Sequence, residues 1–160
     1  MSYLELLEKN DNSILYKDEI VAVLIERNPV VKGQLTIIPV APKKILEELS
    51  DEEITRLFIT ANKLSIVLFE KLKCQGTNFI IRNGVSAGQV EPQFSISLIP
   101  RFEKDGLSLE WKAGEGKDLD ADGKLLSDAL SSSKVELEKE EPVGKEESND
   151  YLVKSLKRVP

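Results

Sequence analysis

The chain has 160 residues, a formal net charge of −6 and 31% charged residues, which fits one domain with an appendage better than two domains. The excess of acid argues against a protein whose main task is to grip nucleic acid through its phosphates. The sequence has no histidine, which excludes Ser-His and Cys-His nucleophilic pairs and histidine zinc ligands. The lone Cys74 excludes an intramolecular disulfide and a cysteine zinc cage, so we expect neither a metal nor a cofactor.

The first residues show no targeting or membrane signal. The start, Met1-Ser-Tyr-Leu-Glu, has neither the basic region nor the long apolar run of a signal peptide. No stretch of the chain approaches the length of a membrane-spanning helix. We therefore expect a cytoplasmic protein in a reducing setting, with no membrane association.

Short apolar runs separated by turn-forming residues predict a helix followed by three strands in the first forty residues. The Asp18-Glu19 pair predicts a tight turn, and Arg27-Asn28-Pro29 breaks the strand that precedes it. The expected elements are a helix over 3–9 and strands over 13–17, 20–25 and 34–40.

The most secure element is a long helix over 50–73. Ser50 is a helix-capping residue and Glu53 stands three positions later, which together predict a capping box. Apolar residues then follow at helical spacing, with acids early and lysines late. Two further strands are expected over 77–82 and 92–102, and the segment 107–111 either adds an edge strand or packs back.

The composition changes after residue 112. Gly, Asp, Glu, Lys and Ser dominate 113–149, which predicts a charged, flexible linker with a short amphipathic helix near 125–130. Apolar residues return among basic ones in 150–160, which predicts a docking tail. The expected organisation is a domain over 1–112, this linker and this tail.

The acidic run from Asp118 to Gly123 matches the opening of an EF-hand calcium loop, with oxygen-bearing residues at positions 1, 3 and 5 and glycine at 6. The twelfth position, which should be a bidentate glutamate, is Ala129. We therefore expect an acidic turn rather than a specific calcium site.

The order of motifs from Ser13 to Arg101 resembles the histidine-triad (HIT) family. The matching stretches are Glu26-Arg27-Asn28-Pro29, Gly33-Gln34-Leu35-Thr36-Ile37-Ile38-Pro39, Asn78, Asn83-Gly84, Ala87-Gly88-Gln89 and Gln93-Phe94-Ser95-Ile96-Ser97-Leu98-Ile99-Pro100-Arg101. Any one of them is weak, but their shared order and spacing are specific. The resemblance implies an α+β fold with an antiparallel sheet of about five strands and one long helix packed on it. It also implies a two-fold homodimer.

The sequence departs from the family at its catalytic positions. Gln93, Ser95 and Ser97 stand where the three triad histidines fall, Gln34 replaces the histidine of the earlier loop, and Pro42 replaces another. In the family the central histidine attacks the α-phosphate. A serine at that position needs a neighbouring base, and no histidine exists to serve. We therefore expect family-type catalysis to be lost.

The resemblance still implies a cleft for a purine nucleotide or a related phosphate compound. Its expected residues are Glu26 for the ribose hydroxyls and Gln34, Asn83, Gly88, Gln89, Gln93, Ser95 and Ser97 around the phosphates. Without the resemblance, the polar positions of 92–102 are a solvated strand face and Asn83-Gly84 is a turn. The main hypothesis is a catalytically inactive nucleotide-binding domain that acts as a sensor or scaffold. The alternatives are a diverged nucleotide-phosphate hydrolase or transferase, and a protein or RNA interaction module that uses the tail.

Overall fold

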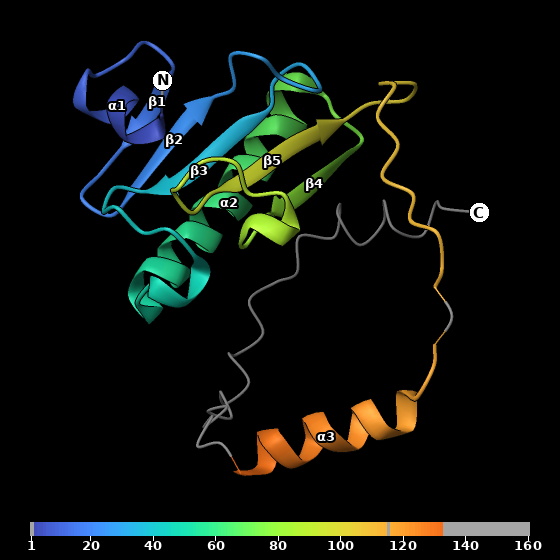
Figure 1. Cartoon of the computed structure of the whole chain (residues 1–160). Coiled ribbons are helices and arrows are strands. Elements are labelled where there is room, and N and C mark those ends of the chain that lie inside the picture. Colours follow the sequence, from blue (N-terminus) through green and yellow to red (C-terminus); the bar gives the residue numbers. More distant parts are fainter. Residues whose placement is uncertain (1, 115, 133–160) are drawn as a thin grey trace, which may run out of the picture. The chain divides into compact units, whose positions relative to one another are not determined.

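The computed structural model describes residues 2–114 and 116–132 and divides the chain into two compact units, Met1–Glu110 and Trp111–Pro160 (Figure 1). The first unit contains the sheet and two of the helices. The expected tail over 150–160 lies outside the described residues. The expected division at residue 112, with a flexible linker after it, stays a prediction.

Two capped helices form where the sequence predicts them. Helix α1 (Tyr3–Glu8) and helix α2 (Asp51–Leu72) each begin with a serine whose side chain accepts from the backbone of a glutamate three residues later. That glutamate reaches back to the backbone of the serine, so both helices carry a capping box. Helix α2 ends where Lys73 adopts a left-handed conformation.

Five strands form one antiparallel sheet in the order β1-β2-β3-β5-β4. The strands are β1 (Ile14–Lys17), β2 (Val21–Ile25), β3 (Leu35–Pro39), β4 (Gly76–Ile81) and β5 (Ile96–Arg101). Short 3₁₀ helices, η1 (Leu46–Glu48) and η2 (Val85–Ala87), lie in the connections. The expected α+β fold with five strands and one long packed helix is therefore confirmed.

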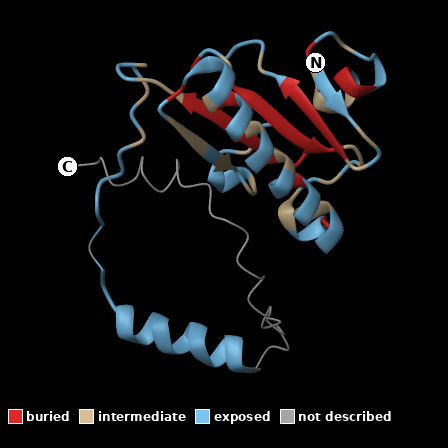
Figure 2. Cartoon of the chain, turned by 180° about the vertical axis from the view of Figure 1, so that it is seen from behind, coloured by how far each residue is buried: buried red, intermediate tan, exposed pale blue. Residues whose placement is uncertain are grey.

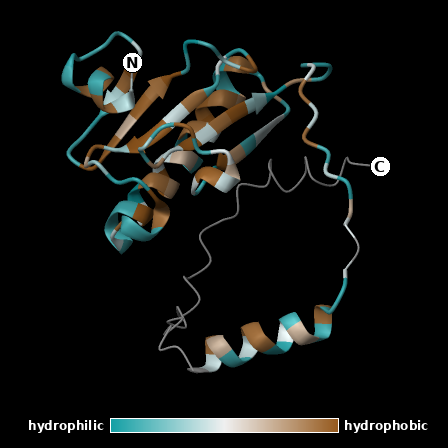
Figure 3. Cartoon of the chain, in the orientation of Figure 1, coloured by the Kyte–Doolittle hydropathy of each residue, from teal (hydrophilic) through white to brown (hydrophobic). Residues whose placement is uncertain are grey.

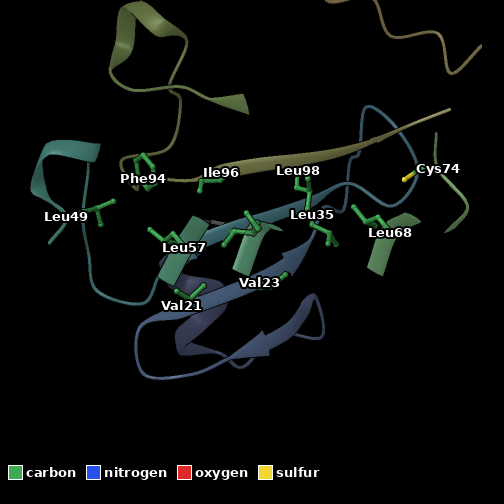
Figure 4. Close-up of a cluster of buried hydrophobic side chains, with 12 residues drawn as sticks. Val21, Val23, Leu35, Leu49, Leu57, Leu68, Cys74, Phe94, Ile96 and Leu98 are labelled. Atoms are coloured by element: carbon green, nitrogen blue, oxygen red, sulfur yellow. The ribbon is translucent and has the colours of Figure 1, made fainter. Parts of the chain in front are cut away.

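Helix α2 covers one face of this sheet. Alternate residues of β2, β3 and β5 point toward it, among them Val23, Leu35 and Leu98, and meet Leu57 and Leu68 of the helix (Figure 4). Figure 2 shows the central strands buried and the outer side of α2 exposed. This packing fixes which residues of each strand face away from the helix.

The opposite face of the sheet is only partly covered. Helix α1 packs Leu6 and Leu7 over Ala22, Leu24 and Ile38, which belong to β2 and β3. The remaining part of this face, over β3, β5 and β4, carries the polar residues of the candidate site.

Strand β5 is shorter than the sequence predicts, because residues 92–95 lie outside the ladder. The Phe94 N–H donates to the Lys43 carbonyl at 2.7 Å, which draws this segment toward the connection before α2. The expected alternation nevertheless holds, since Phe94, Ile96 and Leu98 are buried in the core on the α2 side.

The segment 107–111 forms no strand. Arg101 binds both carboxylate oxygens of Asp105 and the Leu107 carbonyl, so the chain is held to the end of β5 as far as Leu107, whereas Trp111 is exposed. Of the two alternatives that the sequence left open, no edge strand forms, and packing back is shown only for the start of the segment.

Within the second unit, helix α3 (Leu119–Ser132) is longer than the short helix expected there. Leu119, Leu126 and Leu130 recur at helical spacing, so the helix is amphipathic, with apolar bands between hydrophilic ones (Figure 3). Of the residues that resemble a calcium loop, Asp118 directly precedes the helix and the others form its start, where the Asp122 N–H donates to the Asp118 carbonyl. They therefore form a helix and not the loop that an EF-hand requires.

Candidate functional site

A cleft of about 230 Å³ lies on the face of the sheet that points away from α2. Its lining residues are Tyr3, Glu26, Gln34, Ile80, Arg82, Gly88, Gln89, Val90, Glu91, Gln93, Ser95 and Ser97. Seven of the eight residues expected at the site from the sequence are in this set. Asn83 is the exception.

The floor of the cleft is set by strand register. Ser97 of β5 lies between Thr36 of β3 and Ile80 of β4 in the ladder. Because neighbouring residues of a strand point to opposite faces, Ser97 faces away from α2, and Ser95, which directly precedes β5, lines the same cleft. No described residue forms a hydrogen bond with either serine hydroxyl, so both are open to a ligand.

One end of the cleft is acidic. The Thr36 hydroxyl donates to Glu26 Oε2 at 3.2 Å, which holds the carboxylate over the sheet. Burial raises the pKa of Tyr3, the Thr36 hydroxyl lowers it, the carboxylates of Glu26 and Glu91 raise it, and Arg82 lowers it. The net result is a pKa of Tyr3 above its usual value, with burial as the largest cause.

Gln34 presents a donor to the cleft. Its side-chain carbonyl accepts from the Val30 N–H at 2.9 Å, which closes the loop between β2 and β3. The amide is therefore oriented with Nε2 as its remaining polar atom, and no described residue accepts from that nitrogen. A phosphate or a carbonyl oxygen is the type of group that it would bind.

Gln93 presents an acceptor instead. Its Nε2 donates to the carbonyls of Pro39 and Ala41, both at 3.0 Å, so both N–H groups are used by the protein. Its Oε1 is buried and has no hydrogen-bond partner among the described residues. Gln93 therefore has no donor left for a phosphate, and the only ligand group it can receive is an O–H or N–H.

The loop from Asn83 to Glu91 is held mainly by its own polar side chains. Gln89 Oε1 accepts from the Gly84 N–H at 2.8 Å, and its Nε2 donates to the carbonyls of Lys44 and Glu91. Asn83 Oδ1 accepts from the Leu46 N–H at 2.8 Å, and its Nδ2 donates to both oxygens of Glu47. Both amides tie the loop to the segment before α2 and offer no free donor to a ligand.

A family model described as HIT domain matches residues 8–104, which is more than half of the chain. The chain belongs to the HIT domain family. An uncharacterised HIT-like protein of Methanocaldococcus jannaschii is 33% identical over 109 residues, which cover 68% of this chain and 82% of that protein.

Two further comparisons give an enzyme and a solved structure. The bis(5'-nucleosyl)-tetraphosphatase (asymmetrical) of Schizosaccharomyces pombe is 28% identical over 94 residues, which cover 59% of this chain but only 52% of the enzyme. The crystal structure of a HIT family member from Bacillus subtilis has a TM-score of 0.72 at 26% identity, and the match covers 82% of this chain and 97% of that chain. The HIT-like fold expected from the motifs is confirmed.

This HIT domain has no histidine at any position. Another candidate nucleophile, the Cys74 thiol, belongs to the buried core cluster on the α2 side of the sheet, and burial raises its pKa. Ser95 lines the cleft, but its described surroundings supply no histidine or lysine as a base. In the described residues no cluster of acids and Cys74 has the geometry of a metal site.

Arg82, Tyr3 and Glu91 are cleft residues that the sequence reasoning missed. Arg82 follows β4 directly and stands two positions after Ile80, so strand alternation puts it on the cleft face. That signal was available in the sequence. The position of Tyr3 could not be predicted in this way, because α1 reaches the cleft only through its packing on β2 and β3.

Proposed function

We propose that this HIT domain protein binds a purine nucleotide, or a related phosphate compound, without hydrolysing it, and acts as a sensor or scaffold. The observation that carries this proposal is the shared cleft. Seven residues chosen from family motifs that are spread over 72 positions, from Glu26 to Ser97, line a single cavity of about 230 Å³. Four of them, Glu26, Gln34, Ser95 and Ser97, keep polar atoms available for a ligand.

The polar groups of the cleft suit a nucleotide. Glu26 at the end of β2 provides carboxylate oxygens for ribose hydroxyls, and Thr36 holds it in place. Gln34 Nε2 and the hydroxyls of Ser95 and Ser97 provide donors for phosphate oxygens. The relative from Schizosaccharomyces pombe is a bis(5'-nucleosyl)-tetraphosphatase, which supports a nucleotide as the ligand here.

Hydrolysis in the family manner uses histidines as the nucleophile and for acid-base help, and this chain has no histidine. Their loss forfeits many powers of ten in rate. The alternative is a diverged hydrolase or transferase that uses another base. Incubation of the protein with diadenosine tetraphosphate and with adenosine phosphoramidate, followed by chromatography, distinguishes the two functions. Turnover that is abolished by Ser95→Ala would establish the enzyme and contradict the proposal.

Calorimetric titration with AMP and GMP tests the binding itself. We expect saturable binding that weakens about tenfold or more in Glu26→Ala, because a charged acceptor for the ribose hydroxyls is lost. Glu70→Ala is the matched control, since Glu70 is exposed on α2, and its affinity should equal that of the unchanged protein. No binding of either nucleotide at millimolar concentration would contradict the proposal.

We further propose a homodimer formed through the β4 edge of the sheet. Strand β4 has a neighbour on one side only, and its Phe79 is exposed. Helix α2 adds exposed Phe58, Ile59 and Ile66 on the same side, at helical spacing. An open strand edge beside apolar residues favours pairing with another strand. HIT domains commonly form two-fold dimers in which the sheets of the two chains are joined.

Light scattering after size exclusion tests the dimer. We expect the mass of two chains for the unchanged protein and of one chain for Ile66→Glu combined with Phe79→Glu. Val67→Glu is the control, because Val67 is also exposed but lies on another side of α2. A single-chain mass for the unchanged protein at all concentrations would contradict the dimer.

The sensor or scaffold role needs a partner, for which the tail over 150–160 is the candidate. Its composition of apolar and basic residues suits a protein or a nucleic-acid segment. Deletion of 150–160 should remove partners from a pull-down, and unchanged partners would count against this role.

In the described residues no helix is long and apolar enough to span a bilayer. The cytoplasmic setting stays a proposal that rests on the lone Cys74.

A further inference from the structure

Arg82 occupies a special position in the cleft, near the place of the family nucleophile. Strands β4 and β5 pair with Ile81 beside Ile96 and Ile80 beside Ser97. Arg82 directly follows β4 and Ser95 directly precedes β5, so the two residues flank the same end of this pairing. Both line the cleft, so the guanidinium belongs to the cavity that contains the strand position at which HIT enzymes carry the attacking histidine.

Arg82 also differs from the other arginines by having no acidic partner. Arg27 pairs with Asp11, Arg56 with Asp18 and Arg101 with Asp105, whereas Arg82 forms no ion pair within residues 2–114 and 116–132. Three of the four arginines in these ranges therefore have their charge neutralised by a carboxylate. The fourth keeps its donors for a group that the protein does not supply.

The loop beside Arg82 leaves room for the guanidinium to approach a ligand. Gly88 has a φ of +83°, and a Cβ at this position would lie 3.5 Å from Arg82 Cδ and 3.8 Å from Arg82 Nε. The bare backbone of Gly88 therefore runs alongside the arginine stem. A residue other than glycine would be strained there by its backbone conformation, while a Cβ would make only an ordinary contact with the arginine stem.

The charges of the cleft are separated along its length. Glu26 follows β2 and Arg82 follows β4, three strand spacings apart in the sheet, which is roughly 14 Å. The lining contains one cation, Arg82, and two carboxylates, Glu26 and Glu91. One guanidinium can neutralise one phosphate group, and the carboxylates repel any further phosphates.

We propose that Arg82 is the anion-binding residue of this cleft and that it selects ligands with a single terminal phosphate, namely nucleoside 5'-monophosphates, over dinucleoside polyphosphates. This inference rests on the proposed nucleotide-binding function. The ribose lies toward Glu26 and the phosphate between Arg82 and Ser95. The volume of about 230 Å³ lies below the usual range of ligand pockets, about 300–1,000 Å³, so the cleft has no room for two nucleotides.

Calorimetric titrations with adenosine, AMP and diadenosine tetraphosphate test this assignment. In the unchanged protein AMP should bind about tenfold or more tightly than adenosine, and more tightly than diadenosine tetraphosphate. In Arg82→Gln the affinity for AMP should fall to that for adenosine, while the affinity for adenosine stays the same. Arg82→Lys keeps the charge and should retain part of the preference.

Arg56→Gln is the matched control, because Arg56 pairs with Asp18 away from the cleft, and its titrations should match those of the unchanged protein. If Arg82→Gln binds AMP as tightly as the unchanged protein, the assignment of Arg82 is overturned while the nucleotide site stands. Tighter binding of diadenosine tetraphosphate than of AMP overturns the selectivity. If neither adenosine nor AMP binds the unchanged protein, both the nucleotide function and this inference fail.

Discussion

At the scale of single residues, Gln93 has a structural role at a position where the family motif implies a histidine. Its two amide N–H groups hold the carbonyls of Pro39 and Ala41, which lie at and just after the end of β3. The side chain of Gln93 therefore links the end of β3 to the segment that leads into β5. Its chemistry is that of a buried amide, which donates to the backbone and cannot act as an acid or a base.

Gln93→Leu should lower the free energy of unfolding by about 1–3 kcal/mol, because it leaves two carbonyls without a donor in a buried place. Urea denaturation measures this loss. Ser95→Ala is the control, since no described residue bonds to the Ser95 hydroxyl, and it should change stability by less than about 0.5 kcal/mol. Equal effects of the two changes would show that the Gln93 hydrogen bonds contribute nothing.

At the scale of elements, the sequence predicts what local signals encode. The predicted capping box at Ser50 and the spacing of apolar residues locate α1 and α2 to within a residue or two, while the capping box at Ser2 was not predicted. Alternation locates the other strands in the same way, but β5 begins four residues later than expected. The family motifs then bring seven of eight expected residues to one cleft.

Long-range contacts account for what the sequence did not predict. Asn83 was expected near a phosphate, but its amide binds Leu46 and Glu47, which lie 37 and 36 residues away in the chain. Gln89 reaches Lys44 across 45 residues. Nothing local in the sequence distinguishes an amide that binds a ligand from one that ties two loops together, because both need the same donor and acceptor.

Asn83→Ala should therefore loosen the η1 segment more than it changes ligand binding. We expect faster hydrogen exchange at the Leu46 amide, which loses its acceptor, and a loss of stability of about 1 kcal/mol. Asn62→Ala, an exposed position on α2, is the control. An Asn83→Ala protein that keeps the exchange rate of Leu46 but no longer binds AMP would return Asn83 to the phosphate site.

At the scale of the whole molecule, carboxylates with several donors make the fold sensitive to acid. The Ser13 hydroxyl and N–H, together with Arg27, lower the pKa of Asp11 to about 2. Burial raises the pKa of Asp18, but the N–H groups of Val21 and Ile20, the Tyr16 hydroxyl and Arg56 outweigh it and lower the pKa to about 2. Both groups tie the N-terminal strands to their neighbours.

In the unfolded state the pKa of aspartate is about 3.9. Because the pKa values of Asp11 and Asp18 are lower than this in the folded state, both carboxylates stabilise the fold above that pH. Their contribution should decline as the pH falls from about 4 to about 2. Thermal unfolding at a series of pH values measures this decline, and Asp18→Asn should make the curve shallower. A curve that is flat over this window would show that the donors do not favour the ionised form.

The central claim is that a HIT domain without histidines keeps its nucleotide cleft. The most direct measurement is a set of ¹H–¹⁵N NMR spectra recorded during titration with AMP. We predict saturable shifts that cluster at the cleft, at Glu26, Arg82, Gly88 and Ser97, and none at the exposed residues of α2 such as Arg56 or Glu70. Shifts confined to surfaces outside the cleft, or no saturable shift at millimolar AMP, would contradict it.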